Sequence, residues 1–436
     1  MRLLSGPGRG AAALLPVLLF FFAVSGLGAQ ERTMNLEESI RRALERSPSL
    51  AQTEASLVSA QQGRRTAVGA YIPRVSASGG ASKNSSTRYD ERTQTTIEGS
   101  SESYSGSLSG SLSLWDGGAR GYALAMARAD LFGAEATLED QRNNVIFQTK
   151  NLYFAALRQA DLLEVNLRRV DQAEESLAMV RRQAQVGTGT TSDTLRAKLE
   201  LTNAQQAVLQ SQNNVRSAQF ALGRQVGLGG PVVPLMPDQL DPEPLALSET
   251  EIFDLAEESS AMVRSASASA DAAELAVKSA RAAYWPTLSM SSGYSWSNNE
   301  PSFSNGNTSW NMRLSGSYTI FNGFSREASV VRSVNQSRVA QLQEADARLQ
   351  IRELVDGALQ TVRTTEQAIA LAEQALAVAQ EDLRVVRERY RLGVATSLDL
   401  VISQISLRQA DVDVVLARYD FALAKADLEA LIGRAL

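Results

Sequence analysis

Residues 104–115 read Tyr-Ser-Gly-Ser-Leu-Ser-Gly-Ser-Leu-Ser-Leu-Trp, in which serine alternates with glycine, leucine or tyrosine as far as Leu114. Successive side chains of a β-strand point to opposite faces, so this period of two predicts one apolar face and one face of small hydroxyls. Residues 75–82, 288–297 and 310–320 alternate in the same way. The chain therefore has four strands of one kind, and we expect a polar loop at residues 83–101 between the first two.

Aromatic residues gather at both ends of these segments. One end carries Tyr71, Trp115, Trp285 and Phe321, and the other carries Tyr104, Tyr294, Trp296 and Trp310. Runs of about 10 alternating residues with aromatic residues at both rims are typical of transmembrane β-barrels. The edge of a soluble β-sandwich is the alternative interpretation of the alternation alone.

Four strands are too few to close a membrane barrel, and open sheet edges are unstable in lipid. Known membrane barrels begin at about 8 strands. Several copies of the chain must therefore contribute to one barrel. Three copies would give twelve strands, although the residues alone do not select three over two or four.

The N-terminus has the features of an export signal. Arg2 and Arg9 precede an apolar run at residues 11–24, which Gly28 and Ala29 follow. A positively charged start, a short apolar core and small residues at a cleavage site define a secretory signal peptide. The apolar run is too short to span a bilayer as a helix. We expect residues 1–29 to be a cleaved signal peptide, with an uncleaved anchor as the alternative.

The composition argues against several functions. The chain has 436 residues, no histidine, no cysteine and a net charge of −5. Histidine is the commonest general base and metal ligand, and cysteine supplies thiol chemistry. The carboxylates are spread along helix faces and form no acid–base constellation, and an acidic chain is a poor partner for nucleic acid. We expect no enzymatic activity, no metal, no cofactor and no nucleic-acid partner.

Proline positions divide the chain. No proline occurs at residues 75–230 or 302–436, so each stretch can hold very long helices. We expect a first structural repeat at residues 30–228, a proline-rich equatorial linker at 229–248 and a second repeat at 249–436. Each repeat would contain, in order, a lead-in helix, two strands, a long helix, a glycine turn and a return helix.

A single offset of 206 residues relates the two repeats. It maps Gly117 onto Gly323, Gly187 onto Gly393, and Asp193 onto Asp399. A constant offset from the second strand to the end of each half indicates an internal duplication.

The long helices carry heptads of apolar residues, with Val362, Ile369, Leu376, Leu383 and Tyr390 recurring every seven residues in the second repeat. This spacing is typical of antiparallel coiled coils, although an amphipathic soluble bundle shares it. Each long helix would extend about 100 Å. The expected fold is therefore a mixed one, with a membrane β-barrel and an α-helical barrel built from long antiparallel coiled coils.

With these motifs the chain resembles the TolC-like outer-membrane efflux proteins over essentially its whole mature length. The first strand of each repeat follows Tyr71-Ile-Pro73 or Tyr284-Trp-Pro286, and the second precedes Leu114-Trp-Asp-Gly-Gly118 or Ile320-Phe-Asn-Gly323. The most telling motif is Arg389-Tyr-Arg-Leu-Gly-Val-Ala-Thr-Ser-Leu-Asp-Leu400.

The resemblance implies a homotrimer that sits in outer-membrane lipid and extends into the periplasm. Each protomer would add four strands to a twelve-stranded barrel and long helices to a periplasmic tunnel. The implied function is that of a passive exit duct in a tripartite efflux or type I secretion system. Its implied partners are a periplasmic adaptor protein and an inner-membrane pump of the RND or ABC type.

The resemblance also implies two sites. The adaptor-docking tips correspond to Val186, Gly187, Thr188, Leu392, Gly393 and Val394, where the glycines could equally just end helices. The periplasmic gate corresponds to Tyr390 and Asp399, with Asp193 as the counterpart in the first repeat. The gate arginine of the family falls at Ala395 and its second aspartate at Ile402, so this chain departs from the family's gating network at both positions. A helix-start carboxylate is the alternative role for both aspartates, and it fits Asp193 better.

A surface-exposed structural or adhesive protein built as a trimeric coiled coil is the alternative function. It would explain the heptads and the export signal. It would not explain four alternating strands placed identically in two repeats.

Overall fold

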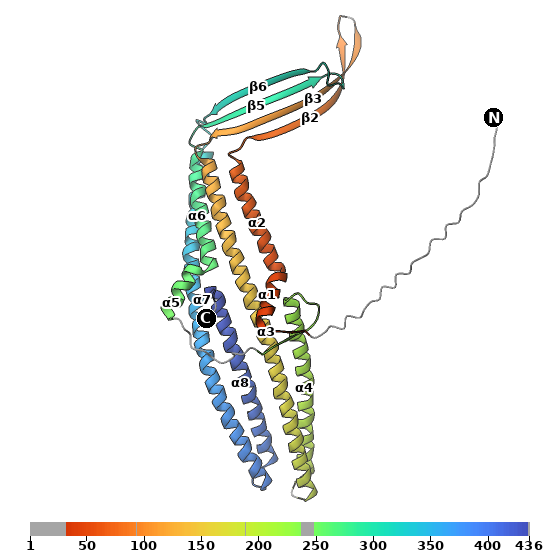
Figure 1. The fold of residues 1–436 in the computed structure, drawn as a ribbon, viewed down its shortest axis with the longest axis vertical. Helices are drawn as coiled ribbons and strands as arrows, with labels where there is room; N and C mark the ends of the chain where they lie inside the picture. Colours follow the sequence, from red (N-terminus) through yellow and green to blue (C-terminus); the bar gives the residue numbers. More distant parts are fainter. Residues whose placement is uncertain (1–31, 93, 188, 237–247, 435–436) are drawn as a thin grey trace, which may run out of the picture.

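The computed structural model describes residues 32–92, 94–187, 189–236 and 248–434, so the expected signal peptide lies outside the described residues. A four-stranded sheet lies at one end of a long bundle of helices, and two helical hairpins form the other end (Figure 1). None of the described helices combines the length and the hydropathy needed to cross a membrane.

The sheet contains both strands of each repeat. Its order is β2-β3-β5-β6 and all neighbours are antiparallel. The strands are β2 (Arg74–Asp90), β3 (Thr95–Trp115), β5 (Thr287–Asn298) and β6 (Asn307–Ser317). The two repeats meet where β3 pairs with β5, which leaves β2 and β6 as the open edges.

The register places like side chains opposite one another. Met290 pairs with Leu112 on one side and with Leu314 on the other, which forms an apolar row across the sheet. Ser107 pairs with Ser78, and their hydroxyls are 2.8 Å apart. The alternation in the sequence therefore becomes one apolar face and one serine face, as predicted.

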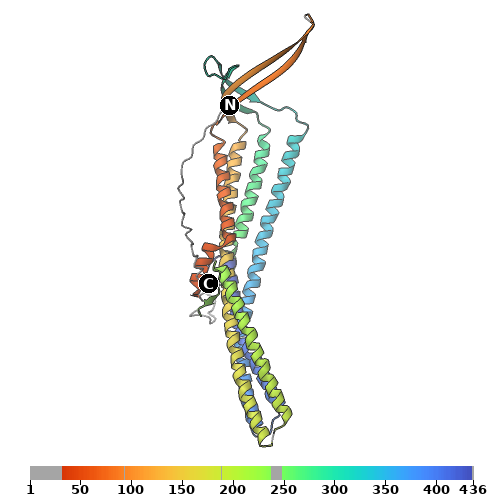
Figure 2. The ribbon, with the colours of Figure 1, turned by 90° about the vertical axis from the view of Figure 1, so that its right-hand side faces the viewer.

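Two predicted strand boundaries are wrong. Residues 83–101 do not form one long loop, because β2 and β3 stay paired as far as Asp90, which lies opposite Thr95. Within this paired segment Lys83 and Glu102 form an ion pair, with 2.8 Å between their charged atoms. The pairing of β3 with β5 begins only at Tyr104, so this polar hairpin projects beyond the rest of the sheet (Figures 1 and 2). The strand expected at residues 310–320 ends at Ser317, because β5 has no residue to pair beyond Thr287.

One long helix of each repeat runs the length of the bundle. The long helices α3 (Ala119–Gln185) and α7 (Ser325–Arg391) have 67 residues each, which corresponds to about 100 Å. Near the sheet α3 packs against the lead-in helices α2 (Pro48–Gly69) and α6 (Ala261–Ala282). Beyond mid-length the partners are the return helices, α4 (Thr191–Gln225) for α3 and α8 (Ser397–Ile432) for both long helices.

The predicted heptad positions Val362, Ile369, Leu383 and Tyr390 of α7 are all buried. They divide between two cores. The first two lie in the cluster around α5 (Glu249–Ser259) near mid-length, and the last two lie between the helical hairpins near their tips. The coiled-coil seam therefore stabilises both ends of the lower half of the bundle.

A small parallel sheet near mid-length was not predicted. β1 (Arg32–Met34) pairs with β4 (Val232–Pro234), next to the short helix α1 (Leu36–Arg46). The hydroxyl of Tyr153 on α3 is fully buried and donates to the backbone carbonyls of Met34, at 3.1 Å, and Leu235. This side chain therefore connects the long helix to β1 and to the residue that follows β4.

Candidate functional site

The glycine turns lie at the end of the bundle opposite the sheet (Figure 2). Gly187 has φ +83° and Gly393 has φ +76°, a left-handed conformation that favours glycine. A Cβ atom added at either position would meet no heavy atom within 4 Å. Backbone conformation, and not lack of space, is therefore the local reason for glycine at both tips.

Apolar side chains beside these glycines are exposed. Val186 is 74% exposed, Leu392 77% and Val394 67%. Thr188, the remaining residue of the predicted tips, lies outside the described residues. Exposed apolar side chains gathered at one end of a molecule indicate an interaction surface.

Each return helix begins with a capping box. The backbone N–H of Asp193 donates to the hydroxyl of Thr190, and the Asp193 carboxylate accepts from the Thr190 N–H. Thr396 and Asp399 form the same pair of bonds at the start of α8. Both aspartates therefore act as helix-start carboxylates, the alternative role that the sequence left open.

The two aspartates differ in their surroundings. Asp193 is half-buried and also accepts a bond from the hydroxyl of Ser397, which belongs to the other hairpin, whereas Asp399 is exposed. The Ser397 and Thr190 hydroxyls hold the pKa of the Asp193 carboxyl below its ordinary value. The backbone and hydroxyl of Thr396 lower the pKa of Asp399 in the same way. Both groups are therefore ionised at neutral pH in the single chain.

Tyr390 is only 6% exposed and packs between the two hairpins, with Ala197 and Leu400 in the same cluster. Its backbone carbonyl accepts a bond of 3.2 Å from the Gln183 side chain. Burial, and then the charge of Asp193, raise the pKa of Tyr390. The fold thus brings Tyr390 and Asp193 together, while Asp399 lies on the exposed side of the turn.

Sequence reasoning missed Ser397 and Gln183, which join one hairpin to the other. Ser397 lies 204 residues from Asp193. No motif marks such a contact, because its two residues come from non-equivalent positions in different repeats.

A cleft of about 600 Å³ opens between the two tips. Its lining includes the charged pair Asp193 and Arg196, 3.9 Å apart, together with Tyr390, Gly393 and Ser397. Such a mixture of charges, hydroxyls and open backbone suits a protruding polypeptide loop. Among the described residues no group of His, Cys, Asp or Glu side chains is placed to hold a metal ion.

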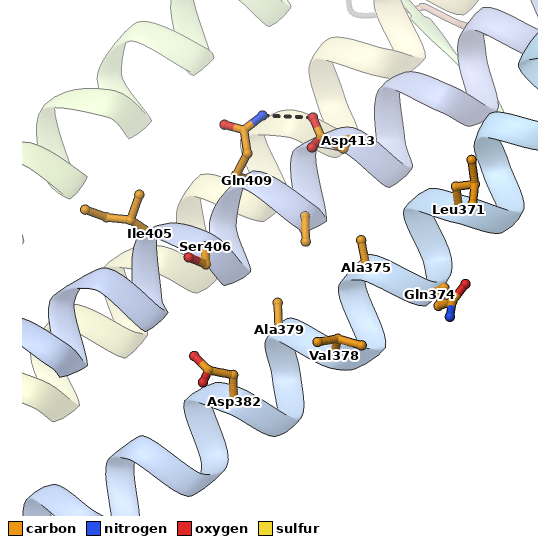
Figure 3. A pocket seen from close by; sticks show the side chains of 11 residues that line it. Leu371, Gln374, Ala375, Val378, Ala379, Asp382, Ile405, Ser406, Gln409 and Asp413 are labelled. Atoms are coloured by element: carbon orange, nitrogen blue, oxygen red, sulfur yellow. Dashed lines mark hydrogen bonds between the residues drawn. The ribbon is translucent and has the colours of Figure 1, made fainter. Parts of the chain in front are cut away.

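A larger, more apolar groove of about 850 Å³ lies between α7 and α8 (Figure 3). Leu371, Val378 and Ile405 line it with exposed fractions of 66%, 64% and 45%. Asp413 at its rim accepts a bond of 2.8 Å from Gln409. Leu371 and Val378 are seven residues apart on one helix, a spacing that suits packing by a further helix.

The sequence profile of the outer membrane efflux protein family matches residues 39–228 and 252–434. Protein CyaE of Bordetella pertussis is 28% identical over 257 residues, which cover 56% of this chain and about half, 52%, of that protein. Outer membrane efflux protein BepC of Brucella suis is 23% identical over 371 residues, with 80% of this chain and 76% of the relative covered. The crystal structure of the outer membrane protein VceC of Vibrio cholerae superimposes with a TM-score of 0.76 at 20% identity, over 92% of this chain and 96% of that one.

These matches confirm the predicted fold, with its sheet at one end of a wall of long helices. They also confirm the predicted location in the outer membrane, with helices that extend into the periplasm, and a role in transport in place of enzymatic catalysis. The matched segments cover well over half of the sequence, and the chain belongs to the outer membrane efflux protein family.

Proposed function

We propose that the protein is the passive exit duct of a tripartite efflux or type I secretion system. Its tips would dock to a periplasmic adaptor, which connects the duct to an inner-membrane pump of the RND or ABC type. The observation that carries this proposal is the pair of exposed apolar glycine turns beside a polar cleft, at the far end of the helices from the sheet. The adhesive alternative gives no reason for that cleft.

A homotrimer is the assembly that best supports this function. The apolar face of the sheet suits lipid, yet β2 and β6 leave two open edges per chain. Pairing β6 of one copy with β2 of the next removes every edge, and three copies give a twelve-stranded barrel. The apolar groove between α7 and α8 is then available for a helix of the neighbouring copy.

The gate proposal includes Tyr390, Asp193 and Asp399. The bond from Ser397 to Asp193 and that from Gln183 to the Tyr390 carbonyl hold the two hairpins of one chain together. Opening the periplasmic end by parting the hairpins would have to break both. Threefold symmetry would place the exposed Asp399 carboxylates of the three copies at one height, as an acidic ring.

The docking role can be tested by replacing Gly187 and Gly393 together with tryptophan. Bulk at both tips should abolish dye export by cells that depend on this duct, while trimer formation and conductance in planar bilayers persist. Alanine at the same positions is the control for backbone strain, because its Cβ atom is disfavoured in the left-handed conformation while it adds little bulk. Gly99→Trp, on the projecting hairpin where a Cβ meets nothing within 4 Å, is the control for bulk away from the tips. Unchanged export in the tryptophan variant would refute docking at the tips.

A further inference from the structure

The four-stranded part of the sheet carries its formal charge on two residues. These are Arg74 on β2 and Arg313 on β6. No other Asp, Glu, Lys or Arg occurs in the segments of this part, which are residues 74–82, 103–115, 287–298 and 307–317. The two arginines therefore give this part of each chain a purely positive charge.

Both arginines lie on the serine face and in a single row. Arg74 pairs with Ser111, which pairs with Ser291, which pairs with Arg313. The row thus begins and ends with an arginine, one on each edge strand. Both side chains are exposed, and no described residue on this face of the four-stranded part carries a carboxylate.

We infer that the serine face lines the lumen of the assembled barrel and that Arg74 and Arg313 form two basic belts there, which bind anionic solutes on their way out. This inference rests on the proposed duct and adds a class of solute to it. Rings of arginine or lysine attract anions in pores. The guanidinium fork bonds carboxylate, sulfonate or phosphate oxygens in pairs, so solutes with several such groups should bind best.

Symmetry fixes the arrangement of the belts. Three copies of Arg74 lie at one height and three copies of Arg313 at another. The row crosses three strand spacings of about 4.8 Å, and strands in a barrel tilt by about 40°, so the belts lie about 9 Å apart along the axis. An extended polyanion can therefore contact both belts at once.

The edge positions support a role in binding over a role in assembly. Each subunit boundary joins a β6 that carries Arg313 to a β2 that carries Arg74. Because the belts lie at different heights, Arg313 of one copy is not directly opposite Arg74 of the next, and two like charges give the edges no attraction for each other.

The test uses the trimer in planar bilayers, with inositol hexakisphosphate added on the side of the barrel mouth. The parent channel should be blocked, and block should weaken when salt rises from about 0.1 M to about 1 M, because the Debye length falls from about 10 Å to about 3 Å. In Arg74→Gln/Arg313→Gln the half-blocking concentration should rise by about tenfold or more, since six nearby charges are lost.

The matched control is Arg88→Gln, which removes a positive charge from the projecting hairpin beyond the four-stranded part and should leave block unchanged. Block of the double variant at the parental concentration, with normal conductance, would overturn the arginine assignment alone. A parent protein that forms no channels would overturn the proposed duct, and the inference with it.

Discussion

Replacing Leu108 with arginine, and separately its neighbour Ser109, tests which face of the sheet meets lipid. Leu108 lies on the apolar face between Ala77 and Tyr294, and it is 51% exposed in the single chain. Ser109 lies on the opposite face, with its hydroxyl 2.8 Å from that of Ser76. The two positions thus share one depth and differ in the side to which they point.

The expected cost differs by about 2 kcal/mol. Leu108 is less than two residues from the midpoint between Tyr104 and Trp115, or about 5 Å along the strand. Arginine on the lipid face near the midplane costs about 2–4 kcal/mol. Replacing Ser109 with arginine removes one hydroxyl hydrogen bond, which is worth about 1 kcal/mol or less. The new charge stays in water on the serine face.

Tryptophan fluorescence can report the unfolding of the sheet, because all four tryptophans, Trp115, Trp285, Trp296 and Trp310, lie in the strands or at their ends. Urea titrations of the protein in lipid vesicles give the free energy of unfolding for each variant. Leu108→Ala is the control for loss of the leucine side chain alone. Equal destabilisation by arginine at positions 108 and 109 would show that the assignment of faces is wrong.

Three further substitutions test the small β1–β4 sheet near mid-length and the tips. Tyr153→Phe removes the bonds to two buried carbonyls and should lower the free energy of unfolding by about 1–3 kcal/mol, whereas Tyr89→Phe, an exposed position, should change it little. Because bonds to the ionised carboxylate lower the pKa of Asp193, the tie between the hairpins should be complete above pH 3.8 and be lost as the pH falls through the lowered pKa. Ser397→Ala should therefore speed amide exchange at the tips at pH 7, and exchange equal to that of the parent would count against the tie. Asp399→Asn should weaken cation selectivity in single-channel recordings more than Asp193→Asn, and equal effects would rule out an exposed acidic ring at Asp399.

The alternation of residues 104–115 predicts the sheet well, because strand faces and cross-strand partners follow from a local period of two. Leu112, Met290 and Leu314 align in the structure as their positions in the pattern require. The pattern fails on the N-terminal side of Tyr104, where residues 95–103 place polar side chains on both faces of the strand. Backbone pairing with β2 continues there without any hydrophobic signal, so the sequence favoured a loop.

Contacts between residues far apart in the chain were beyond sequence reasoning. β1 and β4 have three residues each, too few for a periodic signal, and they pair across about 200 residues of chain. The bond between Ser397 and Asp193 has the same character, since the internal duplication predicts equivalent positions and not which positions meet. Gly187 and Gly393 could be identified from the sequence because a left-handed turn at the end of a helix favours glycine, which is a local signal.

In the proposed duct, the ring of Asp399 carboxylates and the two arginine belts would act as separate charged sites. Asp399 is exposed at the tips, where Arg196 and Arg391 also lie, and the four-stranded part of the sheet presents Arg74 and Arg313. The long helices set the ends about 100 Å apart, whereas the Debye length at physiological salt is about 8 Å, so neither end feels the field of the other. A cation would meet the proposed Asp399 ring on entry, and an anion would meet the proposed arginine belts on exit. Such a duct would admit solutes of either charge. The choice of solute would then lie with the pump, and the arginine belts would attract anions from the tunnel into the barrel.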